Sequence, residues 1–344
     1  MTTVQENVEF QLAVKAWGEA MLAHLYPGAL VMTFSGPRMW EWLATGMQMA
    51  GFEHWDSFCW LHAQGFPKAQ DIGKLVATAT GEQPIGEVPN PAFTFMKNSG
   101  QTSTGWKGVI PETKLVYANA FQGYKTPALK PAWEPILCFR APRQGMTYAE
   151  IATKYGSGCL NVDGGRTAAG RYPANVILDE ESAIMLDTQS GISKSRKISA
   201  MNPGKITPVA MNWGLDDRST ISYEDSGGAS RFFFCAKASS QERNAGCEDL
   251  PNDHPCVKPL ALCRYLASLL LPPASVASRR LFVPFAGSGS GMIGGMLAGW
   301  DEIVGVEQDP HYCEVAKLRL QYWRMASQNY DGFYLHDHRA EMMR

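Results

Sequence analysis

Three kinds of signal are missing from this 344-residue sequence. None of its eight cysteines forms a Cys-x-x-Cys pair, which argues against a structural zinc site or a disulfide scaffold and favours a reducing cytoplasm. No apolar run approaches the ~20 residues needed to span a bilayer, and residues 2–11 carry no signal-like core. Basic residues number 31 against 33 acidic ones, so no overall positive charge indicates a nucleic-acid partner. These absences predict a cytoplasmic protein without a membrane segment or a metal site.

The signal that is present centres on Arg280–Gln308, RLFVPFAGSGSGMIGGMLAGWDEIVGVEQ. An apolar run leads into a turn with Gly287 and Gly289, a small-residue helical stretch follows, and a second apolar run ends on Glu307. Glycines admit positive φ and close ligand approach, and the helix N-terminus offers free N–H groups. Glu307 lies 20 positions after Gly287, near the spacing at which a carboxylate binds ribose hydroxyls. The pattern predicts a nucleoside cofactor, either NAD or S-adenosylmethionine; a plain tight turn is the simpler alternative.

Hydrophobic periodicity along the rest of the chain predicts one α/β domain. Helical spacing occupies residues 8–25, 39–50, 260–271, 292–299 and 310–324, so we expect the first helix to begin at Val8. Strand-like runs occupy residues 29–34, which we expect to be a buried parallel strand, 52–60, 136–140, 175–178, 231–236, 281–285 and 303–306. Residues 62–126 and 180–225 are polar and irregular, and the tail after Arg324 shows little pattern. The predicted fold is therefore a sheet with irregular inserts, in which the cofactor half comes last.

A second motif, His254-Pro-Cys-Val-Lys258-Pro, stands just before the helix that leads to the glycine turn. Together with Pro284-Phe-Ala-Gly-Ser-Gly289, it resembles the circularly permuted (β-class) DNA amino-methyltransferases, and in particular their phage and prophage type. Further matching segments cover most of the chain from residue 8 to 324: 26–30, 33–35, 51–60, 65–68, 128–135, 158–163, 170–175, 230–233, 237–239 and 242–243.

The resemblance implies a Rossmann-like, doubly wound fold of the S-adenosylmethionine-dependent methyltransferase type, in permuted order. It implies a single methyltransferase domain over 1–344, with a catalytic half at 1–61, DNA-contacting inserts at 62–126 and 185–229, and a cofactor half at 250–324. The S-adenosylmethionine site it implies consists of His254, Lys258, Pro284, Phe285, Ala286, Gly287, Ser288, Gly289, Glu307 and Gln308. His254 is open to a second role, a loop-ordering hydrogen bond, and Glu307 could be a solvent-facing strand end.

The sequence departs from the family pattern at several positions. Val283 replaces the family's Asp before the glycine turn, Ser290-Gly291 replaces Thr-Thr, and Cys256 replaces Thr. The family's catalytic loop, Asp/Asn/Ser-Pro-Pro-aromatic, is expected at the end of a strand before the first helix, and no such loop precedes Val8. Asn90-Pro-Ala-Phe93 is the nearest match, but it lies in the first insert and is better explained as an incidental turn. The catalytic residues therefore remain unassigned, and the sequence is either a late-starting frame or a degenerate or split enzyme.

Double-stranded DNA is the partner that the resemblance implies, with a base flipped out of the duplex to reach the methyl donor. Candidate contacts are Lys68, Lys130, Trp133, Arg171, Arg231 and Lys237, with Trp106, Tyr117, Tyr124 and Trp213 as stacking groups. Solvated loops are the alternative for the inserts, and packing of a β-turn is the alternative for 130–134.

Three functions follow. The leading one is transfer of a methyl group from S-adenosylmethionine to an exocyclic amine of DNA, with adenine N6 favoured over cytosine N4. The second is a non-catalytic DNA- or cofactor-binding remnant of the same fold. The third, an NAD-dependent dehydrogenase, fits only the glycine turn and Glu307.

Overall fold

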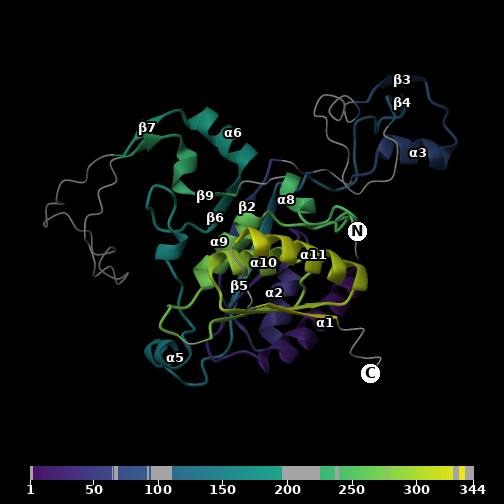
Figure 1. The fold of residues 1–344 in the computed structure, drawn as a ribbon. Helices are drawn as coiled ribbons and strands as arrows, with labels where there is room; N and C mark the ends of the chain where they lie inside the picture. Colours follow the sequence, from purple (N-terminus) through teal and green to yellow (C-terminus); the bar gives the residue numbers. More distant parts are fainter. Residues whose placement is uncertain are drawn as a thin grey trace, which may run out of the picture.

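The computed structural model describes residues 3–63, 65, 69–90, 93, 111–195, 225–236, 240–276, 278–327 and 333–337 (Figure 1). The first helices and strands alternate as α1 (Val4–Leu22), β1 (Leu30–Phe34), α2 (Trp40–Met49) and β2 (Glu53–Leu61). A Cβ on Gly46 would lie 2.6 Å from Val14, so α1 and α2 cross too closely for a side chain there.

The first helix begins earlier than its apolar spacing indicated. The expected start at Val8 is wrong, because α1 begins at Val4 and Val8 lies within it with an exposed side chain. Thr3 and Glu6 form a capping box that satisfies two free N–H groups of the first turn. Periodicity could not place this start, since Val4 is exposed and residues 5–7 are polar. The first turn of α1 therefore occupies the stretch directly before Val8.

The larger sheet has the strand order β1-β5-β2-β6-β9. Its other members are β5 (Trp133–Arg140), β6 (Val176–Asp179) and β9 (Phe234–Ala236). β5 runs antiparallel to both β1 and β2, whereas β6 and β9 continue from β2 in parallel. Our expectation of a buried parallel strand at 29–34 is wrong, because β1 lies at an edge, pairs antiparallel with β5 and is only half-buried.

The second sheet is parallel and contains β10 (Arg280–Val283), β11 (Glu302–Glu307) and β12 (Phe333–Asp337). Its helices are α9 (Leu260–Leu270), α10 (Ser290–Ala298) and α11 (Pro310–Ala326). α9 and α10 pack closely, because a Cβ on Gly294 would lie 2.5 Å from Cys263. β12 belongs to the tail in which the sequence showed little pattern.

Helices cover both faces of the larger sheet (Figure 1). On one face, α1 and α2 bury Val14 and Met47 against Phe139 of β5. On the other, α9 buries Leu262 and Leu269 against β5 and β6. Phe282 of β10 packs against the α1–α2 cluster, so the two sheets share one core. The expected α/β architecture, with helices on both faces, is confirmed.

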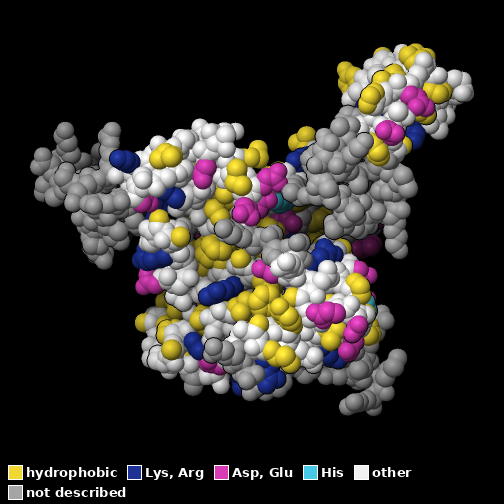
Figure 2. All heavy atoms as spheres, turned by 45° about the horizontal axis from the view of Figure 1, so that its top comes forward, with side chains coloured by type: hydrophobic (Ala, Val, Ile, Leu, Met, Phe, Trp, Pro, Cys, Tyr) yellow, Lys and Arg dark blue, Asp and Glu magenta, His cyan; other side chains and the backbone are white. Residues whose placement is uncertain are grey.

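The two inserts contain more regular structure than the sequence indicated. The first insert forms an arm that projects from the body (Figures 1 and 2). This arm contains α3 (Ile72–Thr80), β3 (Gly86–Pro89) and β4 (Thr113–Val116). In and around the second are α6 (Glu180–Ser190), β7 (Ser193–Lys194), β8 (Ser226–Gly227) and a 3-10 turn, η3 (Ala229–Phe232). The remaining short elements are α5 (Tyr148–Tyr155), η1 (Asp163–Gly165) and α8 (Ser240–Asn244). The expectation of purely irregular inserts is wrong, because Asp71 and Asp179 cap α3 and α6 at their N-termini.

Candidate functional site

The glycine turn has the expected strand–turn–helix geometry, with β10 leading into α10. Gly287 has φ +53° and Gly289 has φ +81°, the left-handed region that favours glycine. A Cβ would lie 2.9 Å from Nε2 of His254 at Gly287 and 3.2 Å from Ala316 at Gly289. No side chain caps α10. Glycine at these two positions therefore allows both the left-handed backbone and the close packing of His254 and Ala316 against the buried turn.

Glu307 ends β11 directly beside this turn. Its Oε2 accepts a hydrogen bond from the Gly287 N–H at 2.7 Å. Its Oε1 accepts from the Gln308 and Asp309 N–H groups, each at 2.9 Å. A carboxylate oxygen has further lone pairs, so both oxygens can still accept from a ligand hydroxyl. The carboxylate thus lies in the turn and is not a solvent-facing strand end.

His254, in the loop before α9, packs its ring against Gly287. Its Nδ1 accepts from the Cys256 N–H at 3.2 Å, which assigns the ring proton to Nε2 in the neutral form. Burial lowers the pKa of His254; Glu307 acts in the opposite direction, and Arg243 adds to the lowering. The predicted loop-ordering hydrogen bond is present, and the same ring also contacts the turn.

Lys258 connects the two halves of the molecule. Its Nζ forms an ion pair with Glu134 at the start of β5, and lies 4.8 Å from the ring centroid of Phe34 and 5.3 Å from that of Trp60. Phe34 and Trp60 stand at the carboxyl ends of β1 and β2. Residues 254–258 therefore run from the glycine turn to the edge of the larger sheet at which β1 and β2 have their carboxyl ends.

The other cofactor candidates surround the turn. Phe285 is exposed and its ring meets Trp17 of α1 edge-on at 5.2 Å, whereas Ala286 and Ser288 are buried. Pro284 is half-buried, and Gln308 is exposed after Glu307. Val283 would lie 3.2 Å from a Cβ on Gly291 and offers no polar side-chain atom.

The DNA-contact candidates fall into different environments. Nζ of Lys130 donates to the Ala63 carbonyl at 2.5 Å, and Trp133 is half-buried opposite Leu61. Arg171 donates to Asp225 at 2.7 and 2.9 Å. Arg231 lies 3.6 Å from the same carboxylate. Both arginines thus help to hold the second insert.

Hydrogen bonds from Ser195 and then Arg171 lower the pKa of Asp225 to about 2. Of the aromatic candidates in the inserts, Tyr117 is half-buried and Tyr124 is exposed on the arm. Lys68, Trp106, Trp213 and Lys237 lie outside the described residues. Asn90 donates to the Pro111 carbonyl within the arm, at 2.9 Å, and Pro91 and Ala92 also lie outside the described residues.

Sequence reasoning did not name four residues near the turn as part of the site, although 242–243 belonged to a matching segment. Arg319 contacts the turn itself, whereas Glu242, Arg243 and Asn252 connect it to the His254 loop. Arg319 is fully buried although it is charged. It follows Ala316 by three positions and precedes Leu320, both of them buried. A charged residue on the apolar face of a helix was the signal available in the sequence.

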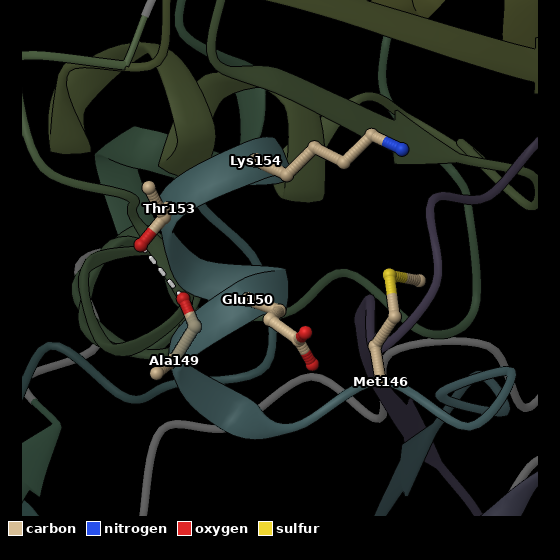
Figure 3. A pocket seen from close by; sticks show the side chains of 5 residues that line it. All are labelled: Met146, Ala149, Glu150, Thr153 and Lys154. Carbon is tan, nitrogen blue, oxygen red and sulfur yellow. Dashed lines mark hydrogen bonds between the residues drawn. The ribbon is translucent and has the colours of Figure 1, made fainter.

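A shallow hollow of about 520 Å³ lies on α5 and is lined by Met146, Ala149, Glu150, Thr153 and Lys154 (Figure 3). None of these residues belongs to the glycine turn or its surroundings, and Glu150 completes the capping box of α5. Within the described ranges, no group of three His, Cys, Asp or Glu side chains could hold a metal ion. The described helices include none that is long and apolar enough to cross a membrane.

No family model and no curated protein matches the sequence. Structural similarity was found to M1.HpyAVI in complex with SAM, with 12% identity over 89% of this chain and 81% of that one and a TM-score of 0.36. TTHA0409 of Thermus thermophilus, described as a candidate DNA modification methylase, matches as a selenomethionine derivative with 13% identity over 97% and 86% of the chains and a TM-score of 0.39. Its complex with S-adenosyl-L-methionine matches with 13% identity over 96% and 82% and a TM-score of 0.37. These TM-scores are too low to assign a function, so the function of this chain is inferred from its own residues.

Proposed function

We propose that this chain forms the donor-binding body of an S-adenosylmethionine-dependent DNA amino-methyltransferase of the permuted type, with adenine N6 favoured over cytosine N4. One observation carries the proposal: the Gly287 N–H, the Glu307 carboxylate and the ring of His254 meet at a single glycine turn. Together with the motifs at 254–259 and 284–289, this arrangement suits a nucleoside-bearing donor.

The residues present fit such a donor. Glu307 would accept hydrogen bonds from the ribose hydroxyls, and its negative charge suits a cationic sulfonium compound. α10 begins directly after the turn and its N-cap residue, Gly289, provides no side-chain cap, so its first backbone N–H groups would serve as donors. Gly287 lets the His254 ring pack against the turn, because a Cβ there would lie 2.9 Å from its Nε2. When bound, S-adenosylmethionine supplies an activated methyl group, so the protein's task is chiefly to position donor and amine. Val283 gives no carboxylate at this site, which leaves Glu307 as the main acidic ligand.

The acceptor side of the site would lie between β1 and β10. Each pairs with a single described strand, β5 for β1 and β11 for β10. Their apolar residues, including Met32 and Phe282, are only half-buried, although strands inside a parallel sheet are normally buried on both faces. In our proposal the acceptor amine lies between Phe34 and the glycine turn, near Lys258, whose Nζ is 4.8 Å from the Phe34 ring centroid.

A second candidate, a cofactor-binding remnant without turnover, is favoured by one observation. Among the described residues, no Asp/Asn/Ser-Pro-Pro-aromatic loop lies at the carboxyl edge of β1 or β10. An in-frame Asp-Pro-Pro-Tyr motif in the genomic DNA shortly upstream of Met1 would contradict the remnant. The active enzyme and the inactive remnant would share the donor site and differ only in whether a methyl group is transferred to DNA.

Titration calorimetry with S-adenosylmethionine and with NAD tests the donor site. We expect S-adenosylmethionine to bind with a Kd of about 1–100 μM and NAD not to bind. Binding of NAD alone would overturn the proposal in favour of a dehydrogenase. Transfer of a labelled methyl group to double-stranded DNA, assayed with the chain as given and with an upstream extension, then separates enzyme from remnant. If neither protein transfers the methyl group, the cofactor-binding remnant is the supported function.

A further inference from the structure

Arg319 of α11 is a fully buried cation directly beneath the glycine turn. Its Nη1 donates to the Ser288 carbonyl at 2.5 Å, to the Ser288 hydroxyl at 3.1 Å and to the Ser290 hydroxyl at 3.0 Å. These are the residues on either side of Gly289. One guanidinium nitrogen therefore binds the turn and the first residue of α10 together.

The other terminal nitrogen of Arg319 points to a different segment. Nη2 donates to the carbonyl of Glu242 in α8 at 3.2 Å. The Glu242 carboxylate in turn accepts from the Leu260 N–H at the start of α9, at 3.4 Å. Arg319 thus joins the turn to the short helix that precedes the His254 loop in sequence.

The next residue, Arg243, holds the His254 loop itself. Its Nε donates to the Asn252 carbonyl and its Nη2 to the His254 carbonyl, both at 3.0 Å. The buried amide of Asn252 donates back to the Arg243 carbonyl at 2.8 Å. His254 then returns to the turn, where its ring packs against Gly287.

These contacts form a closed circuit from the turn through Arg319, α8 and Arg243 to His254, and back to Gly287. A contribution to stability alone does not explain why the charge of Arg319 is buried. The hydrogen bonds from Arg319 go to neutral oxygens, its Nε has no partner among the described residues, and burial lowers its pKa. The positive end of α10 also lies beside it, which adds electrostatic cost. Well-packed apolar side chains often stabilise such positions more than buried charges do.

We propose that Arg319 and Arg243 are positioning residues that fix the glycine turn and the His254 loop relative to each other and thereby set the affinity for the nucleoside donor. This inference rests on the proposed donor site. A ligand bound by Glu307 and the turn on one side and by His254 on the other requires a fixed distance between the turn and the His254 loop. The circuit of hydrogen bonds fixes that distance.

The test compares Arg319→Met, Arg319→Lys, Arg243→Lys and the double lysine variant with wild type. Arg280→Lys is the matched control, because Arg280 lies on β10 and forms an exposed ion pair with Glu302. Calorimetry with S-adenosylmethionine is run at a temperature at which circular dichroism shows every variant folded. We expect a loss of affinity of roughly 10- to 100-fold for each Arg319 variant and less than about twofold for the control.

The double variant separates positioning from packing. If the circuit acts as one unit, Arg319→Lys with Arg243→Lys should lose no more affinity than the worse single variant, whereas independent packing losses should add. Wild-type affinity in the Arg319 variants, or additive losses, would overturn the inference and leave the donor site standing.

Hydrogen exchange provides a readout that needs no ligand. Exchange at the amides of 287–291 and 254–256 should rise together in the Arg319 variants and stay unchanged in Arg280→Lys. Unchanged exchange at both segments would also overturn the inference. If wild type binds no S-adenosylmethionine while the coupled rise is present, the proposed function fails and the circuit remains. If Arg319→Met does not fold, the lysine variants still decide.

Discussion

The proposed cofactor half (residues 250–324) and the arm contain similar kinds of element but bury them differently. In residues 260–327, helices α9 and α10 bury large side chains such as Leu262, Met292 and Ile293 completely. In the arm, the buried residues of α3 are Gly73 and Ala77, and β3 is exposed along its length. A two-stranded hairpin with one short helix has little apolar area to bury. The cofactor half is therefore stabilised by packing, and the arm depends more on individual hydrogen bonds.

Two glycines give the largest expected contrast between these regions. At Gly294 an added Cβ would lie 2.5 Å from Cys263 and 2.6 Å from its backbone, whereas at Gly86 in β3 nothing lies within 4 Å. Gly294→Val should separate α9 from α10 and lower the free energy of unfolding by about 3 kcal/mol. Gly86→Val should change it by less than about 0.5 kcal/mol. Urea unfolding followed by circular dichroism measures both, and equal shifts would contradict the difference in packing.

Two glutamates that accept backbone N–H groups sharpen the comparison at the level of function. Glu307 accepts from Gly287, while Glu82 accepts from Ala118 within the arm at 2.7 Å. Glu307→Ala should weaken S-adenosylmethionine binding by about 10- to 100-fold, because charge-assisted hydrogen bonds are worth about 1.5–3 kcal/mol. Glu82→Ala should loosen the arm and leave calorimetric affinity unchanged. Retained affinity in Glu307→Ala would remove that residue from the proposed site.

The proposed cofactor half and the arm also differ in how well the sequence predicted them. The glycine turn was predictable because Gly287, Gly289 and Glu307 form a spaced pattern that needs only local backbone rules. The elements of the arm were not, since α3 has nine residues and β3 and β4 have four each, too few for a periodic signal. β1 was assigned as a strand correctly, but an apolar run cannot tell a parallel from an antiparallel neighbour or a central strand from an edge.

Long-range contacts set a second limit on prediction. Lys258 meets Glu134 across 124 positions, and Arg319 meets Ser288 across 31. The motif around Lys258 was visible in the sequence, but its ion-pair partner was not. Neither spacing is a local period, so only the fold brings these pairs together. The donor turn was therefore predictable and its supporting contacts were not.

A pH titration distinguishes the second insert from the cofactor half with a smaller effect. Hydrogen bonds from Ser195 and Arg171 lower the pKa of Asp225 to about 2, below the ordinary value of about 3.9. Because the folded value is depressed, this stabilising contribution is complete above about pH 4 and is lost as the pH falls towards 2. Protection of the 193–195 amides, relative to their intrinsic exchange rate at each pH, should fall across that window, and Asp225→Asn should show low protection already at pH 5.

Asp301 provides the matched case in the cofactor half. Hydrogen bonds from Arg279 lower its pKa to about 2 as well, at the turn before β11. Asp301→Asn should loosen the start of β11 and leave 193–195 unchanged, and Asp225→Asn should do the reverse. A common response of both segments to either substitution would mean that the insert and the cofactor half unfold as one unit.

The smallest expected effects come from the base of the arm, where Asp71 has two partners. It caps α3 by accepting from the Lys74 N–H at 3.2 Å and forms a partly exposed ion pair with Lys125 at 2.5 Å. Lys125→Ala removes only the ion pair and should cost the arm less than about 0.5 kcal/mol, whereas Asp71→Ala also removes the cap and should cost about 1 kcal/mol more. Exchange rates of the α3 amides report this local stability directly, because the core of the cofactor half dominates global unfolding. Equal costs for the two variants would show that the ion pair, and not the cap, holds α3 to the arm, since only the ion pair is lost in both.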